Sequence, residues 1–251
     1  MKKAGIKYKT TLAGHLTVWS LIFIMLELPC AQKKVTAPLL FNFHQQTLWL
    51  SAARCIFWEE KSVLIVSDLH FGKSGHFRKS GIGIPQHVFK EDLQRLFAQI
   101  LFFKPKTLLV TGDMFHSSAN KELDFFLKWR TDIPGVAFQL VKGNHDILSA
   151  NFYREADINV SDERLNMDPF CFTHDAADCK DSSNYIFSGH IHPGVKMNGI
   201  AAQSLMLPCF YFGKNYAVMP AFSAFTGLAK IKPAESDHVF ALVENEVIRI
   251  Q

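Results

Sequence analysis

Two histidines stand one residue apart in the stretch FSGHIHP, residues 187–193, directly after a short apolar run. Four other stretches have the same form, in which a carboxylate, amide or imidazole side chain follows an apolar run. An isolated aspartate or histidine at such a place is usually a turn former, a helix cap or a surface residue. Repetition at five places instead predicts one shared site, with the candidate metal ligands Asp68, His70, Asp113, Asn144, His174, His190 and His192.

The donor atoms of this set restrict its chemistry. No thiolate belongs to it, so a structural zinc site of the cysteine kind is not expected. Imidazoles are too numerous for a calcium or magnesium site built from oxygens, whereas mixed imidazole and carboxylate ligands suit manganese, iron or zinc. The seven ligands fit two ions if one carboxylate bridges them. Two ions about 3.5–4 Å apart can hold a phosphate, activate a water and stabilise a leaving oxygen.

Short apolar runs predict the strands that must position these ligands, at residues 62–66, 107–110, 136–141, 169–172 and 184–187. Apolar residues at helical spacing predict helices within residues 85–103 and 120–130. Turn-like breaks within residues 39–60 predict an opening hairpin. Alternation of strand and helix predicts a layered α/β fold, and in such folds sites form at the carboxyl ends of the strands.

The five blocks resemble those of the calcineurin-like metallophosphoesterase superfamily. That family carries D-x-H, G-D, G-N-H-D/E, a lone H and G-H-x-H at its strand ends, and the chain has all five in this order between Val63 and Pro193. The resemblance implies an α/β (α+β) fold, a four-layer metallophosphoesterase sandwich. In that sandwich two mixed β-sheets are flanked by helices and the active site lies at the C-terminal strand ends.

The resemblance also implies a role for each ligand. One ion would be held by Asp68, His70, Asp113 and His192, and the other by Asp113, Asn144, His174 and His190, so that Asp113 bridges. A hydroxide bridging the two divalent transition-metal ions would attack phosphorus; manganese is the first expectation, with iron or zinc as alternatives. His145 would protonate the leaving group and Asp146 would orient His145. His116 is either a substrate or supporting residue, or an ordinary histidine at a helix start.

Two longer strings narrow the resemblance. SDLHFGKSGHFRKSGIGIP and LPCFYFGKNYAVMPAFSAFTG resemble the bacterial ligase-associated DNA-damage-response endonucleases, over about Leu39 to Gly227. Resemblance to this branch implies metal-dependent cleavage of phosphodiester bonds in DNA. It also implies a role in DNA repair, in which the enzyme acts alongside DNA ligase and helicase-type proteins. Lys73, Arg78 and Lys79 follow a ligand pair and could hold phosphates flanking the scissile one, although their charge pattern equally fits a solvated loop. The aromatic residues of the second string are either base-stacking residues or core of a second sheet.

Two other functions remain open. An enzyme of the same family could act as a phosphodiesterase or pyrophosphatase on a nucleotide or a lipid-linked diphosphate. A binding module without catalysis is disfavoured, because no ligand is missing and the histidine after Asn144 is present.

Composition is that of an ordinary globular protein. The chain has 251 residues, 48% hydrophobic and 20% charged, with a net charge of +4 and a pI of about 8.7. This charge permits a nucleic-acid partner without demanding one. The five cysteines are odd in number and form no CxxC pair, so we expect a reducing, cytoplasmic location and no disulfide framework.

Residues 1–34 are expected to be an extension outside the catalytic domain, which would occupy residues 35–251. Lysines precede an apolar run there, as in a secretory signal, but no clean cleavage site follows. A mis-called start, with Val35 as the true first residue, and an amphipathic segment are the other interpretations. The apolar run is too short for a comfortable membrane span, so no stable membrane partner is expected.

Overall fold

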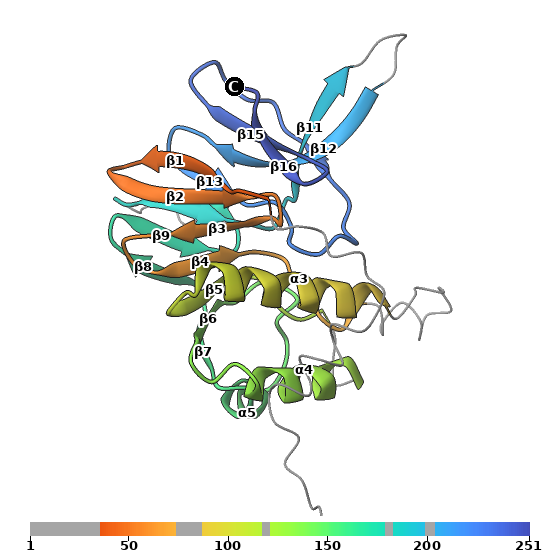
Figure 1. Ribbon diagram of the computed structural model, residues 1–251. Coiled ribbons are helices and arrows are strands. Elements are labelled where there is room, and N and C mark those ends of the chain that lie inside the picture. The colour runs from red at the N-terminus through yellow and green to blue at the C-terminus, as the bar shows by residue number, and fades with distance from the viewer. Residues whose placement is uncertain (1–35, 74–86, 117–120, 179–182, 199–203) are drawn as a thin grey trace, which may run out of the picture. The chain divides into compact units, whose positions relative to one another are not determined.

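The computed structural model describes residues 36–73, 87–116, 121–178, 183–198 and 204–251 (Figure 1). By its contacts the chain divides into Met1–Lys33 and Lys34–Gln251, and the second unit is the one described below. The expected extension, together with Arg78 and Lys79 of the basic loop, lies outside the described residues.

The first sheet joins an antiparallel half to a parallel half. Its strands follow the order β1-β2-β3-β4-β5-β6-β7. Pairing is antiparallel from β1 to β4 and parallel from β4 to β7. The strands are Leu39–Phe43, Gln46–Ser51, Cys55–Trp58, Val63–Val66, Thr107–Thr111, Ala137–Val141 and Ile158–Ser161. The predicted hairpin and the predicted strands at 62–66, 107–110 and 136–141 are therefore confirmed.

The second sheet contains nine strands in the order β14-β11-β12-β13-β10-β9-β8, with β15 paired to β12 and β16 paired to β15. Strand β10 runs parallel to both of its neighbours, β9 and β13. The strands β8 to β16 are Arg164–Met167, Phe170–Thr173, Tyr185–Ser188, Pro193–Asn198, Ser204–Phe212, Tyr216–Val218, Ala229–Lys230, His238–Val243 and Glu246–Arg249. The remaining two predicted strands correspond to β9 and β10.

The main core lies between the two sheets. Side chains alternate between the two faces of a strand, so one set from each strand points toward the other sheet. The first sheet contributes aliphatic residues such as Ile56, Ile65 and Leu109, and the second contributes mainly phenylalanines. Phe212 of β12 shows how closely they pack, since its ring lies 5.0–6.0 Å from four other aromatic rings, those of Phe41, Phe43, Phe187 and Phe240.

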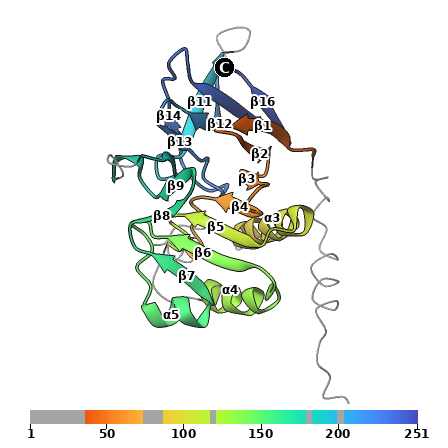
Figure 2. The same cartoon turned by 90° about the vertical axis from the view of Figure 1, so that its left-hand side faces the viewer.

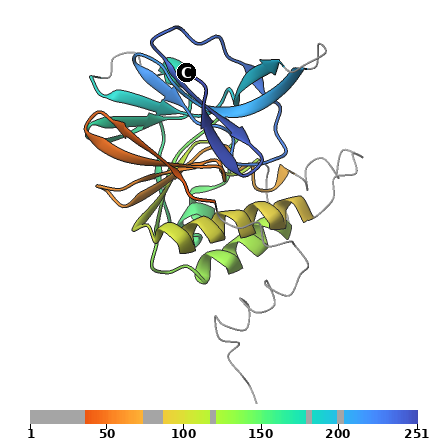
Figure 3. The same cartoon turned by 45° about the horizontal axis from the view of Figure 1, so that its top comes forward.

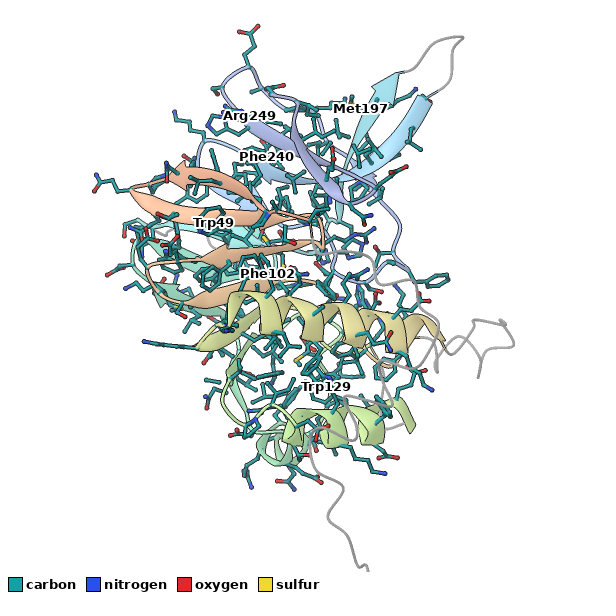
Figure 4. All side chains as sticks on the ribbon, viewed as in Figure 1. Trp49, Phe102, Trp129, Met197, Phe240 and Arg249 are labelled. Carbon is teal, nitrogen blue, oxygen red and sulfur yellow. The ribbon has the colours of Figure 1, made fainter. Side chains whose placement is uncertain are left out.

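The α-helices of the described residues cover the other face of the first sheet. They are α3 (His87–Phe103), α4 (Lys121–Thr131) and α5 (Ala150–Glu155). Figures 1 and 3 show α3 and α4 side by side, and Figure 2 shows α4 and α5 near β6 and β7. Phe103 of α3 stacks on Phe57 of β3, with ring centroids 4.9 Å apart. Trp129 of α4, which is labelled in Figure 4, packs on Phe138 of β6. Both predicted helices are confirmed.

The outer face of the second sheet carries a short 3-10 turn, η1 (Ala176–Asp178), whose Ala176 packs on Cys171 and Ile186. The predicted sandwich of two mixed sheets with flanking helices is thus confirmed, with the long helices of the described ranges gathered on one sheet. None of the helices within the described ranges is long and apolar enough to cross a membrane.

The inter-sheet core predicts a stability difference between two phenylalanines. Phe212→Ala should lower the free energy of unfolding by about 3–5 kcal/mol, because it removes a buried ring from close packing. Phe102→Ala, on the exposed side of α3, should change it by less than about 0.5 kcal/mol. Urea denaturation of both variants measures this, and equal losses would contradict the described core.

Candidate metal and catalytic site

The five predicted ligand blocks meet at one edge of the sandwich. Three follow the adjacent strands β4, β5 and β6 of the first sheet, and two follow the adjacent strands β9 and β10 of the second. Contacts between the blocks cross from sheet to sheet. The backbone N–H of His190 donates to Asp68 Oδ2 at 3.2 Å, and His174 Nδ1 lies 3.3 Å from the carbonyl oxygen of Thr111.

The first donor group consists of Asp68, His70 and His192, whose ligand atoms all lie within 4.8 Å of one another. His70 Nε2 and His192 Nε2 are 3.5 Å apart, and His192 Nε2 lies 3.2 Å from Asp68 Oδ1. Asp68 Oδ1 is buried and, within the described residues, accepts no hydrogen bond of acceptable geometry. Such a buried, unsatisfied carboxylate oxygen beside two imidazoles fits a bound cation.

The second donor group centres on His174. Because the Thr111 carbonyl can only accept, His174 Nδ1 carries the proton and Nε2 presents a lone pair. His174 Nε2 lies 3.0 Å from Asn144 Oδ1, 3.0 Å from His190 Nδ1 and 3.5 Å from Asp113 Oδ2. Acceptor atoms from separate loops thus converge on one point, an arrangement that a cation stabilises. Asp68, Asp113 and His174 also form a triple within 4.8 Å, so Asp68 belongs to both groups.

Protonation states favour metal binding. Burial, followed by the nearby Lys73 charge, lowers the pKa of His70 to about 2, so its imidazole is neutral and offers a lone pair. Burial alone would raise the pKa of Asp68, but its contacts with His192 and Ser67 outweigh burial and hold the pKa below its usual value. Both groups therefore have the deprotonated forms that metal ions require.

The ligands stand on strained backbone. Asp68, His70, Asp113, His190 and His192 have φ between +50° and +68°, a left-handed conformation that costs an ordinary residue about 1–2 kcal/mol. Strain of this kind persists only where surrounding structure enforces it, and it gathers at functional sites.

Glycines let these loops approach one another. At Gly112, φ is +87° and a Cβ atom would lie 2.0 Å from His174 Nδ1. At Gly189 a Cβ atom would lie 1.8 Å from Ser67 Oγ. Any larger residue at either position would push apart two loops that carry ligands.

His145 lies at the rim of the site and not among the two donor groups. Its backbone N–H donates to Asp113 Oδ1 at 2.9 Å, and its partly exposed ring carries Nε2 4.0 Å from Asp113 Oδ2. The ring centroid of His116 is 4.1 Å from that of His145 and 5.2 Å from that of His70. The ring of His116 therefore lies beside the rings of both His145 and His70.

Asp146 has partners other than the expected ones. Its two carboxylate oxygens accept the backbone N–H groups of Gly143 and Phe115 at 2.9 Å and of Met114 at 3.3 Å. The predicted contact with the imidazole of His145 is absent from these bonds. Asp146 instead joins the loop after β6 to the loop after β5, because its carboxylate is buried where only backbone donors reach it.

Lys73, three residues after His70, adds a positive charge near the first donor group. Burial lowers the pKa of this half-buried lysine, while the charges of Asp113 and Asp68 act to raise it. Its ammonium group therefore lies in the field of both carboxylates. Arg78 and Lys79, expected to act with it, lie outside the described residues.

The backbone contacts of one segment of the site gave no sequence signal, although the segment overlaps the second of the two resembling strings. The backbone N–H groups of Phe222, Ser223 and Ala229 donate to the carbonyl oxygens of Ser67, Asp68 and His192 at 2.7, 3.1 and 3.0 Å, respectively. Arg54 Nη1 donates to the carbonyl oxygens of Ala221 and Ser223, and the Arg95 guanidinium lies 4.4 Å from the ring centroid of Phe222. Backbone hydrogen bonds of this kind depend on no particular side chain, so only the fold reveals them.

Comparisons with known proteins agree with this geometry. The sequence profile of the calcineurin-like phosphoesterases matches residues 61–192, slightly more than half of the chain. No curated protein matches. Among solved structures, the chain is similar to the nuclease MPE of Pseudomonas putida, with 26% identity, a TM-score of 0.73, and coverage of 85% of this chain and 100% of that chain.

Two further structures are more distant. Yfce, a phosphoesterase from E. coli, has 12% identity over 72% of this chain and 88% of its own, and the protein AQ665 of Aquifex aeolicus has 18% identity over 56% and 82%. Both have a TM-score of 0.37, too low to bear on the site.

The glycine beside Asp113 gives a test of the site's geometry. Gly112→Ala should destabilise the metal-free protein by at least about 1–3 kcal/mol, because it adds a Cβ at positive φ, and should reduce bound metal, because the ring of His174 must move. Gly135→Ala is the matched control, since nothing lies within 4 Å of its added Cβ. Urea denaturation and metal analysis measure both effects; full metal content in Gly112→Ala would contradict the close approach of the two loops.

Proposed function

The chain belongs to the calcineurin-like phosphoesterase family, is accordingly a metal-dependent phosphoesterase, and on that basis we propose that it cleaves phosphodiester bonds in DNA with two divalent ions. The observation that carries the proposal is the pair of donor groups at the junction of the two sheets, which share Asp68. The 26% identity to a nuclease over 85% of the chain supports a nucleic-acid substrate.

The proposed ion sites follow the donor groups. Asp68, His70 and His192 would hold one ion, and Asn144, His174 and His190 would hold the other. Asp113, which forms a triple with Asp68 and His174, would offer its carboxylate to both ions. Bound ions would hold the phosphate, lower the pKa of a water and stabilise the leaving oxygen. Asn144 and His190 are exposed whereas Asp68, Asp113 and His174 are buried, so the phosphate approaches from the side of the second ion. Manganese is the proposed metal, since the ligands mix imidazole with carboxylate and amide oxygen.

The surrounding side chains then have distinct tasks. His145 protonates the leaving oxygen, because its ring is at the open rim, beside Asp113 but outside both donor groups. The ring of His116 packs against the ring of His145, with centroids 4.1 Å apart, and keeps it in position. Lys73 provides a positive charge for a phosphate oxygen, and Arg78 and Lys79 belong to the same proposed phosphate-binding loop. A role in DNA repair beside DNA ligase and helicase-type proteins, in the cytoplasm, completes the proposal.

Metal analysis and a substrate panel test this function. The protein should bind two divalent ions per chain and, with manganese, cleave single-stranded or duplex DNA; excess EDTA should abolish cleavage. Asp113→Ala should lose both ions and all activity, because the bridging carboxylate is gone. Asp124→Ala, an exposed change on α4, is the control and should lose neither. Cleavage of a nucleotide or lipid-linked diphosphate in place of DNA would overturn the choice of substrate while leaving the metal site intact.

The proposed role of His145 predicts a dependence on the leaving group. His145→Ala should keep both ions and lose about 10²–10⁴-fold in kcat on DNA, whose alkoxide leaving group needs a proton. On bis-p-nitrophenyl phosphate the loss should be much smaller, because the aryl oxide leaves without one. Equal losses on the two substrates, or loss of metal, would contradict the role of proton donor.

A further inference from the structure

Three exposed apolar side chains stand in the loops that form the metal site. Ile147 comes two residues after His145 and is 72% exposed, and Ile191 lies between the ligands His190 and His192 and is 45% exposed. Phe225 is also 45% exposed and lies in the segment that follows Ser223. Single exposed apolar side chains are ordinary on a protein surface, and what distinguishes Phe225 is the attachment of its segment to the site.

The segment around Phe225 is attached to the first donor group at both ends. Ser223 N–H donates to the carbonyl oxygen of Asp68 at 3.1 Å, and Ala229 N–H donates to that of His192 at 3.0 Å. Residues 224–228 therefore span from one ligand of the first ion to another. Phe225, within this span, is thus anchored on both sides to the backbone of candidate ligands.

Two partly buried arginines fix the start of the same segment. Arg54 Nη1 donates to the carbonyl oxygens of Ala221 and Ser223 at 3.2 and 2.8 Å. Arg95 is paired with Asp92 at 2.7 Å and lies over the ring of Phe222. Phe222 is fully buried beneath this arrangement whereas Phe225 is 45% exposed, so of the two rings it is that of Phe225 that lies at the surface.

We propose that Phe225 stacks on a nucleobase of the nucleotide adjoining the scissile phosphate. This inference rests on the proposed function. A base is joined to its phosphate through one sugar, so a phosphate held by the ions places its base close to the rim of the site. Aromatic rings stack on any base without reading its sequence, and a stacked or paired base of a duplex must first be exposed. Phe225 thus favours an unpaired strand.

The test compares oligonucleotides with and without bases. Phe225→Ala should raise the KM for a single-stranded oligonucleotide by about tenfold. On an oligomer of the same length made of tetrahydrofuran abasic residues, wild type and Phe225→Ala should be equal, because both lack the stacked pair. Phe225→Trp should restore the wild-type KM, and Phe225→Leu should not, since it keeps bulk without an aromatic face. Phe102→Ala, which removes an equally exposed ring from α3, should match wild type on every substrate.

Several outcomes would overturn the inference. They are an unchanged KM in Phe225→Ala, an equal loss on the abasic oligomer, or full rescue by leucine. Metal content and melting temperature of Phe225→Ala should equal those of wild type, and a fall in either would mean that the residue is structural. Failure of the proposed function is distinct from all of these, because wild type itself would then leave the oligonucleotide intact while still hydrolysing another phosphoester.

Discussion

The architecture of the site depends on a buried carboxylate at the junction of two sheets. Asp68 follows strand β4 of the first sheet, yet its Oδ2 accepts a backbone N–H from His190, which follows strand β10 of the second sheet, and its carbonyl oxygen accepts one from Ser223. Its remaining oxygen, Oδ1, faces imidazoles. Negative charge and lone pairs are thus concentrated where water is largely excluded, which is unfavourable without a compensating cation. The donor set is best understood as half of an interaction that the metal completes.

The backbone of the site is constrained as well as its side chains, through strained dihedral angles and closely packed glycines. Asp113 adopts a left-handed conformation directly after Gly112, whose own φ is also positive. The conformation of Asp113 carries a steric cost that an isolated loop would relieve, whereas Gly112 adopts its own because it has no Cβ. The aromatic core between the sheets, with Phe187 and Phe212 fully buried, holds the strand ends rigidly enough to enforce them. Distant packing therefore contributes to metal binding by keeping the ligands where the loops alone would not place them.

The ligands and the strands before them could be predicted from sequence because each carries its own signal, a β-branched or aromatic run followed by a side chain with metal-binding atoms. The role of Asp146 could not, because it lies beside His145 in sequence and yet its carboxylate turns to backbone donors of another loop. Phe222 and Phe225 are equivalent in the string AFSAFTG, but one is core and the other is exposed. Which ring reaches the surface depends on the partly buried Arg54 and Arg95, far away in the sequence.

Because the ligands are divided between two sheets, metal binding affects the stability of the folded protein and its resistance to degradation. An ion that binds only when both sheets are docked stabilises the folded chain by RT ln(1 + [M]/Kd), about 1.4 kcal/mol for every tenfold rise in free metal above Kd. Apparent stability is then set by metal supply as well as by sequence. In metal-poor surroundings the sheets would separate more often at this edge and the chain would be degraded sooner. Abundance of the enzyme would thus follow the availability of the ion that it needs.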